Sequence, residues 1–187
     1  ITTANDASNA VTLTGAVELT NGITIDTDTA GTDGAITFTS TVVSQDNEDN
    51  TLTLTSGDGA IAFQGAVGGA ADSADNLGDL AVTGATTLTG NVSTTGQQDF
   101  NSAITLAADT TLNSGTDNDA INVDSTVDGG YDFTIDAGTG VVTMGGALGG
   151  STAINLFSAT GSTINLEGNI TTANDASNAV TLTGAVE

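Results

Sequence analysis

LTLTSGDGAIAFQGAVGG, residues 52–69, is the stretch that decides the fold. Its apolar residues come in pairs two positions apart, Leu52/Leu54 and Ile61/Phe63, on either side of a glycine-rich turn. Residues two apart lie on the same face of an extended strand, so this spacing is typical of strands with one face in a core. The stretch therefore predicts two short strands joined by a tight turn.

The same pairing recurs along the whole chain and predicts an all-β fold. In residues 1–169 the pairs are Val11/Leu13, Ile23/Ile25, Ile36/Phe38, Leu52/Leu54, Ile61/Phe63, Leu80/Val82, Ile104/Leu106, Ile121/Val123, Phe133/Ile135, Val142/Met144, Ile154/Leu156 and Ile164/Leu166. Val180/Leu182 then restarts the series. Turn-rich segments separate the pairs, and no stretch carries an apolar stripe with the 3.6-residue period of a helix.

An exact repeat organises the chain. Residues 1–18 read ITTANDASNAVTLTGAVE, and residues 170–187 read the same, letter for letter. We expect one full unit at 1–169, the start of the next identical unit at 170–187, and no independent domain boundary. We also expect the chain to be a window from a longer tandem array.

A weaker duplication lies inside the unit. Residues 133–150 read FTIDAGTGVVTMGGALGG and match residues 52–69 at an offset of 81, while LEGNI at 166–170 matches LTGNV at 88–92 at an offset of 78. We interpret the unit as two diverged halves, roughly 10–92 and 103–169, with loops of unequal length between matched strands.

These observations favour a parallel β-solenoid built from tandem repeats. Coils of two or three strands would take roughly 20–28 residues each, so that one unit would stack about six to eight coils. Aliphatic and Phe side chains would then stack inside, with Thr and Asn in ladders outside. The absence of Pro agrees, because the neighbouring coil needs every backbone N–H. The alternative is an array of β-sandwich domains of about 80 residues, which would require linkers between domains.

The composition excludes several classes of function. The chain contains no Lys, Arg, His, Pro, Cys or Trp, and its 23 acidic residues give a formal net charge of −23. A polyanion without cations repels nucleic acid and anionic headgroups, and no apolar run is long enough to span a membrane. No His, Lys, Arg or Cys is present to serve as base, nucleophile or oxyanion partner beside the carboxylates. We therefore expect no enzyme, no catalytic residues and no required cofactor.

Calcium is the one ligand that the sequence suggests, because hard cations take several oxygen ligands from carboxylates. The candidate residues form three clusters: Asp26, Asp28 and Asp33; Asp46, Glu48 and Asp49; and Asp117, Asp119 and Asp124. None of the clusters matches an EF-hand loop. The alternative interpretation is that these are solvated turn residues that keep the surface soluble, and both interpretations stay open at this point.

Thr-x-Thr stretches suggest another function, ice binding by a flat Thr ladder. They occur at Thr12/Thr14, Thr37/Thr39/Thr41, Thr51/Thr53/Thr55, Thr87/Thr89 and Thr181/Thr183. Their irregular spacing along the chain argues against one flat array, and Thr is also favoured on any solvated strand face.

The stretches VTLTGAVELTNGITIDT, GAITFTSTV and LTLTSGDGAIAFQGAVGG resemble the repeats of very large bacterial surface proteins of the filamentous-haemagglutinin and giant-adhesin type. The resemblance covers essentially the whole chain and rests on repeat cadence and on Thr, Gly, Asn and Asp usage. It implies secretion, a right-handed β-helical rod, and a role in adhesion or cell–cell connection. We thus expect a structural segment of a secreted filament or adhesin stalk at the bacterial cell surface. The expected partners are neighbouring repeats or identical filaments, with any cell-surface or carbohydrate receptor binding outside this stretch.

Overall fold

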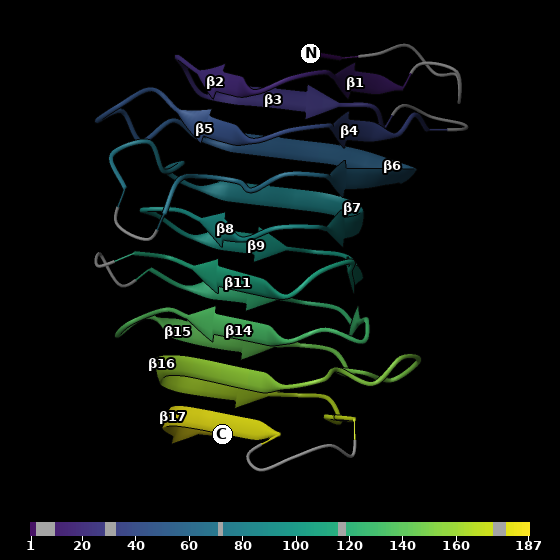
Figure 1. The fold of residues 1–187 in the computed structure, drawn as a ribbon, viewed down its shortest axis with the longest axis vertical. Coiled ribbons are helices and arrows are strands. Elements are labelled where there is room, and N and C mark those ends of the chain that lie inside the picture. The colour runs from purple at the N-terminus through teal and green to yellow at the C-terminus, as the bar shows by residue number, and fades with distance from the viewer. Residues whose placement is uncertain (3–9, 29–32, 71–72, 116–118, 174–178) are drawn as a thin grey trace.

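Stacked coils of β-strand run along one axis from the N-terminus to the C-terminus in the computed structural model (Figure 1). The structure describes residues 1–187 except 3–9, 29–32, 71–72, 116–118 and 174–178. The described residues contain no helix, and every strand pairing among them is parallel. The all-β prediction and the parallel β-solenoid are therefore confirmed, and the β-sandwich alternative is wrong, because sandwich domains pair antiparallel neighbours.

Three columns of parallel strands make up the solenoid. Column 1 holds β1 (Val11–Leu13), β4 (Ile36–Phe38), the second half of β6 (Leu52–Phe63), the second half of β7 (Leu80–Leu88), β10 (Ile104–Leu106) and β13 (Val127–Asp128). It continues through single bridges to Leu148 and Ile170.

Column 2 follows next along the chain within each coil. It holds β2 (Val17–Leu19) and β5 (Val42–Ser44), then Val67 through single bridges, β8 (Val92–Ser93), β11 (Thr110–Asn113), β14 (Phe133–Asp136), the first half of β16 (Phe157–Leu166) and the first part of β17 (Val180–Val186).

Column 3 completes each coil. It holds β3 (Ile23–Asp26), the first halves of β6 and β7, β9 (Gln98–Phe100), β12 (Ile121–Val123), β15 (Val141–Met144), the second half of β16 and the end of β17. The chain thus passes through columns 1, 2 and 3 in turn, with three strand positions in every coil.

The length of a coil varies, although its number of strand positions does not. The first coil runs from Val11 to its partner Ile36, whereas the much shorter fourth coil runs only from Thr86 to its partner Ile104. The solenoid has about 7 turns, within the predicted six to eight. The fourth coil is shorter than the predicted range of coil length, because it has compact corners that the sequence spacing does not reveal.

The inward faces of the three columns form one continuous apolar core. Equivalent residues of successive coils stack, so that Phe38 lies on Phe63 with ring centroids 5.2 Å apart, and Phe133 lies on Phe157 at 6.0 Å. All five Phe side chains are buried, as predicted. Stacked rings of this kind contribute stabilisation beyond that of the apolar area they bury, so each of these four Phe residues stabilises the contact between two coils.

One predicted pair is wrong. Ile154 is buried, but Leu156 is half-buried, and the strand begins one residue later at Phe157. Phe157 and Ala159 are the residues that point into the core there. Ile154 instead belongs to the connection from column 1 to column 2, where it forms a single bridge to Thr172.

A polar side chain occupies the core of the shortest coil. Gln98 is fully buried, and its amide nitrogen donates to Thr94 Oγ1 at 3.1 Å and to the Asn113 carbonyl at 2.8 Å. These bonds join column 3 to the adjoining corner and to the next coil. Buried polar groups are costly unless they are hydrogen-bonded. The two contacts satisfy the Gln98 amide donors, whereas Gln98 Oε1 has no hydrogen-bond partner among the described residues.

We expect Phe63→Ala to lower the free energy of unfolding by about 3–5 kcal/mol, because it removes a fully buried ring and its stacking partner loses contact. Urea unfolding followed by circular dichroism measures the change. Thr37→Ala is the control, since Thr37 lies in the same column on the outward face, and its effect should stay within about 0.5 kcal/mol. Equal effects of the two substitutions would contradict the assignment of inward and outward faces.

Candidate functional site

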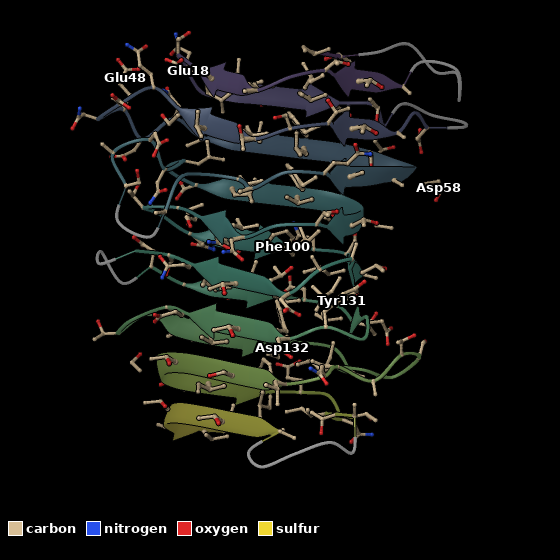
Figure 2. The ribbon with its side chains drawn as sticks, in the orientation of Figure 1. Glu18, Glu48, Asp58, Phe100, Tyr131 and Asp132 are labelled. Atoms are coloured by element: carbon tan, nitrogen blue, oxygen red, sulfur yellow. The ribbon has the colours of Figure 1, made fainter. Side chains whose placement is uncertain are left out.

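Most of the described acidic side chains lie at the corners of the solenoid rather than in one site, whereas Glu18, Asp99 and Asp128 lie within strands. Figure 2 shows Glu48 projecting from one edge of the stack and Asp58 from the opposite edge. The first edge carries the corners that join column 2 to column 3, and the second carries those that join column 3 to column 1. The predicted calcium-binding residues are therefore divided between two edges.

Asp26, Asp28 and Asp33 lie at one corner between columns 3 and 1. Asp26 ends β3, and its Oδ1 accepts a hydrogen bond from the Asp28 N–H at 2.9 Å. Asp33 Oδ2 accepts from the N–H of Asp58 in the next coil, also at 2.9 Å. A side chain on Gly57 would collide with the carboxylates of both Asp28 and Asp33, so glycine at 57 leaves room for two negative charges at one point.

Asp46, Glu48 and Asp49 are exposed in the corner that follows β5. Glu48 Oε2 accepts from the Asn50 side chain at 3.2 Å, while Asp49 Oδ1 accepts from the Thr95 hydroxyl at 2.9 Å. Thr95 belongs to a later coil of the stack. The carboxylates of Glu48 and Asp49 are therefore used in separate contacts, and Asp49 helps to tie distant corners of the same edge together.

The third predicted cluster is dispersed. Asp117 lies outside the described residues. Asp119 is exposed in the connection between columns 2 and 3, and its backbone carbonyl accepts from the Ser114 hydroxyl at 2.8 Å. Asp124 is exposed just after β12, at the opposite edge. No three carboxylates come together as a metal-binding group anywhere in the described part of the chain, and calcium binding stays a prediction.

The outward face of column 1 carries a partial Thr ladder. Its successive residues are Thr12, Thr37, Ala62, Thr87, Thr105 and Asp128. Thr-x-Thr stretches far apart in the sequence do become neighbours, as a ladder requires. Ala62 and Asp128 interrupt the row of hydroxyl groups, so a flat ice-binding array would have few successive positions on this face.

Sequence reasoning missed a polar groove on the outward face of column 3. It has a volume of about 320 Å³ and is lined by Thr51, Thr53, Asp79, Ala81, Gln97 and Asp99. Asp99 accepts hydrogen bonds from the side chains of Gln97 at 2.7 Å and Asn122 at 2.8 Å. The groove exists because Ala81 stands between larger polar residues of the same ladder. Only the register of the coils could have revealed this neighbourhood.

The first coil leaves the end of the core open. A cavity of about 210 Å³ lies there, and its lining is mostly apolar, with Ile1, Leu13, Val17, Ile23 and Phe38 among the residues that form it. Val11, Leu13, Val17 and Ile23 are only half-buried, although they point inward. At the other end Val180 and Val186 of β17 are 41% and 51% exposed. Both end coils therefore present apolar residues that no coil among the described residues covers.

Comparison with known proteins adds no family to this description. No protein-family model, no curated protein and no solved structure matches the chain. Within the described residues there is no helix with the length and apolar character needed to cross a membrane.

We expect Asp28→Asn to raise the free energy of unfolding by about 0.2–1 kcal/mol at low ionic strength, because it relieves repulsion between the two carboxylates beside Gly57. Added sodium chloride should shrink this gain by screening. Thermal unfolding at several salt concentrations measures both effects.

Glu167→Gln is the matched control, since Glu167 is an exposed acid elsewhere on the chain. A calcium site at the Gly57 corner would make calcium raise the unfolding midpoint of the unaltered chain more than that of Asp28→Asn. An equal calcium response in the chain and in both variants would show that calcium acts only as a diffuse counterion.

Proposed function

We propose that this chain is a structural segment of a long secreted filament or adhesin stalk at a bacterial cell surface. The single observation that carries the proposal is the continuity of the three columns, in which each coil hydrogen-bonds to the next along the whole stack. The resemblance of the repeats to giant bacterial surface proteins supports the same role.

The mechanics follow from the direction of the backbone hydrogen bonds. The bonds between coils point along the stack, as in Val11 N–H to Ala35 O at 2.8 Å and Leu80 N–H to Gln97 O at 2.9 Å. Bending the stack would stretch such bonds on its convex side and would separate the stacked apolar side chains there. A solenoid of this design resists bending, and it lengthens by adding coils that keep the same three strand positions.

The charge of the surface supports an extracellular rod that stays dispersed. One unit holds 21 acidic residues, which is the 23 of the chain less Asp175 and Glu187 of the repeated segment. With about 7 turns at roughly 4.8 Å per coil, one unit is about 35 Å long. The rod then carries about one negative charge per 1.7 Å, the axial charge density of duplex DNA. A charge density of this order attracts a cation atmosphere and keeps parallel rods apart.

A structural rather than catalytic role agrees with the side chains that the chain contains. Without Lys, Arg, His or Cys, no cation, imidazole or thiol is present to stabilise an oxyanion or to act as a nucleophile. The same lack of Lys and Arg leaves trypsin no site to cleave, which suits a fibre exposed to the surroundings of a cell.

We expect an array of three units to scatter X-rays as a rod about 105 Å long, since each unit contributes about 35 Å at the spacing of stacked strands. Aligned samples should give a meridional reflection near about 4.8 Å. Small-angle scattering and fibre diffraction measure the two quantities. Compact beads joined by flexible linkers, seen as a much shorter rigid length in scattering and as separate globules in electron micrographs, would overturn the proposal.

We expect divalent cations to bundle such arrays at concentrations where monovalent salt of equal ionic strength leaves them dispersed. Divalent ions neutralise a dense polyanion more effectively because fewer ions need to be held near it. Light scattering during titration with magnesium or calcium chloride measures bundling, and sodium chloride is the control. If magnesium and calcium act alike, the effect belongs to the whole surface, whereas bundling by calcium alone would favour the alternative function as a calcium-dependent adhesin module.

Ice binding is the remaining alternative, and the partial Thr ladder of column 1 is the observation that favours it. It would require thermal hysteresis in a cooled solution of the chain. We place it below the structural proposal because Ala62 and Asp128 interrupt the ladder.

A further inference from the structure

The repeated sequence of 1–18 and 170–187 occupies different columns at the two ends of the chain. Val11 pairs with Ile36 in column 1, whereas Val180, which stands at the same position of the repeat, pairs with Phe157 in column 2. The start of the repeat agrees. Thr2 bridges to Asp26 in column 3, but Ile170, which repeats Ile1, bridges to Leu148 in column 1. One sequence thus adopts strand structure at two rotational positions of the solenoid, one column apart.

The number of strand positions in the unit explains this shift. The successive column 1 partners after Val11 are Ile36, Ile61, Thr86, Ile104, Val127, Leu148 and Ile170, which makes seven complete coils. Val180 lies one column further on. Seven coils of three positions and one more position make 22 strand positions in one unit. Since 22 is not a multiple of three, the repeat cannot return to the column in which it began.

The two diverged halves of the unit also differ by a whole number of strand positions, which is half of the 22 in the unit. Leu52 starts in column 3 of the second coil, and its match Phe133 lies in column 2 of the sixth, 11 positions later. Leu88 in column 1 of the fourth coil and its match Leu166 in column 3 of the seventh are also 11 positions apart. The sequence offsets of the two matches differ, at 81 and 78, but the strand positions do not. The repeat therefore conserves a count of strands rather than a count of residues.

The two end coils also form the two halves of one junction. The strand sequence VTL uses one edge at 180–182, where it pairs with β16, and the opposite edge at 11–13, where it pairs with β4. The same residues of this strand, the valine and leucine positions, face the core in both places. Phe157 lies next to Val180, and Val11 lies next to Ile36, so that joining the copies gives an apolar row without a break. The next column agrees, since Ile164 pairs with Val186 and the equivalent Val17 pairs with Val42.

From this geometry we propose that tandem copies of the unit continue one solenoid and that each copy is turned by one column, a third of a turn, relative to the copy before. The next copy covers the exposed apolar residues of β17, and the preceding copy closes the cavity at the first coil. Three copies of the unit complete 22 coils before any residue returns to its original face. This inference rests on the proposed function, because it requires that the units be arranged in tandem within a rod.

The rotation determines on which side of the filament each unit exposes a given surface feature. A surface feature of one unit, such as the corner with Asp28 and Asp33, recurs about 35 Å along the axis and about 120° around it. A partner that binds one face of a unit is therefore displayed on three sides of the filament in turn. Parallel filaments, in the same way, meet equivalent surfaces on three sides, which favours bundles over flat layers.

The chain itself provides the first test, because it contains no Cys and each added pair reports one contact. Ser158→Cys with Thr181→Cys should form a disulfide under mild oxidation, since these outward residues are direct neighbours in column 2, within the range a disulfide spans. Thr12→Cys with Thr37→Cys should also form a disulfide, since these residues are neighbours in column 1 at the other end of the chain. Mass spectrometry without reduction measures the yield.

Ala147→Cys with Ala179→Cys is the matched control and should give no disulfide. If the second copy began in the column of the first, its Val180 strand would stack on Leu148, and this control pair would be the one to oxidise. A disulfide in the control pair together with none between positions 158 and 181 would overturn the rotation.

A three-unit array tests the consequence directly. Tyr131 is 40% exposed, and Tyr131→Cys in every unit provides one attachment point per unit for a maleimide-linked gold particle. Electron micrographs should show particles about 35 Å apart along the rod and about 120° apart around it. Particles in one line along a straight rod would overturn the rotation while leaving the rod intact, whereas particles on separate globules would overturn the proposed function instead.

Discussion

Backbone hydrogen bonding between successive coils is the constraint on which the rest of the structure depends. A coil can add to the stack only if its strands lie in register on those of the coil before, so inward residues must recur at the same three positions. The apolar pairs, the stacked Phe rings and the absence of Pro all follow from this requirement. The corners are not bound by it, and their lengths differ enough to make the coil that starts at Thr86 much shorter than the one that starts at Val11.

The variable corners carry the charge. Because a corner contributes little to the ladder, Asp and Glu there do not disturb the core, and glycines such as Gly57 make room where two carboxylates meet. The consequence is an acidic surface on more than one edge. Within one edge, side-chain hydrogen bonds such as that between Asp49 and Thr95 join the corners of different coils. This arrangement fits a rod held apart from its neighbours by charge better than it fits a single binding site, because the carboxylates are spread over many coils.

The strand count of the repeat links the core to the surface. Growth by duplication preserves whole strand positions, because a copy that ended partway through a position would place polar residues in the core and apolar ones at a corner. It does not need to preserve the column, since all three columns accept aliphatic residues. A unit of 22 positions is as stable as one of 21 in this respect, and the extra position turns each copy around the axis. The proposed mechanical role and the proposed display of the surface thus both depend on the number of strand positions in the unit.

The sequence by itself determined the all-β character, the repetition and the inward residues of many strands, because period-two alternation and exact repeats are local properties of the chain. No predicted apolar pair falls in β2, β5, β8, β9, β11 or β13, most of which lie in column 2. Its acidic turns were also visible, although their division between two edges was not. Only the tertiary structure decided that Gln98 is buried, that Leu156 is not an inward strand residue, that Asp79 and Asp99 line a groove beside Ala81, and that identical segments lie in different columns. The physical reason is that these features depend on which strand lies on which. That register is set by corners whose lengths vary and whose composition does not indicate where the next column begins.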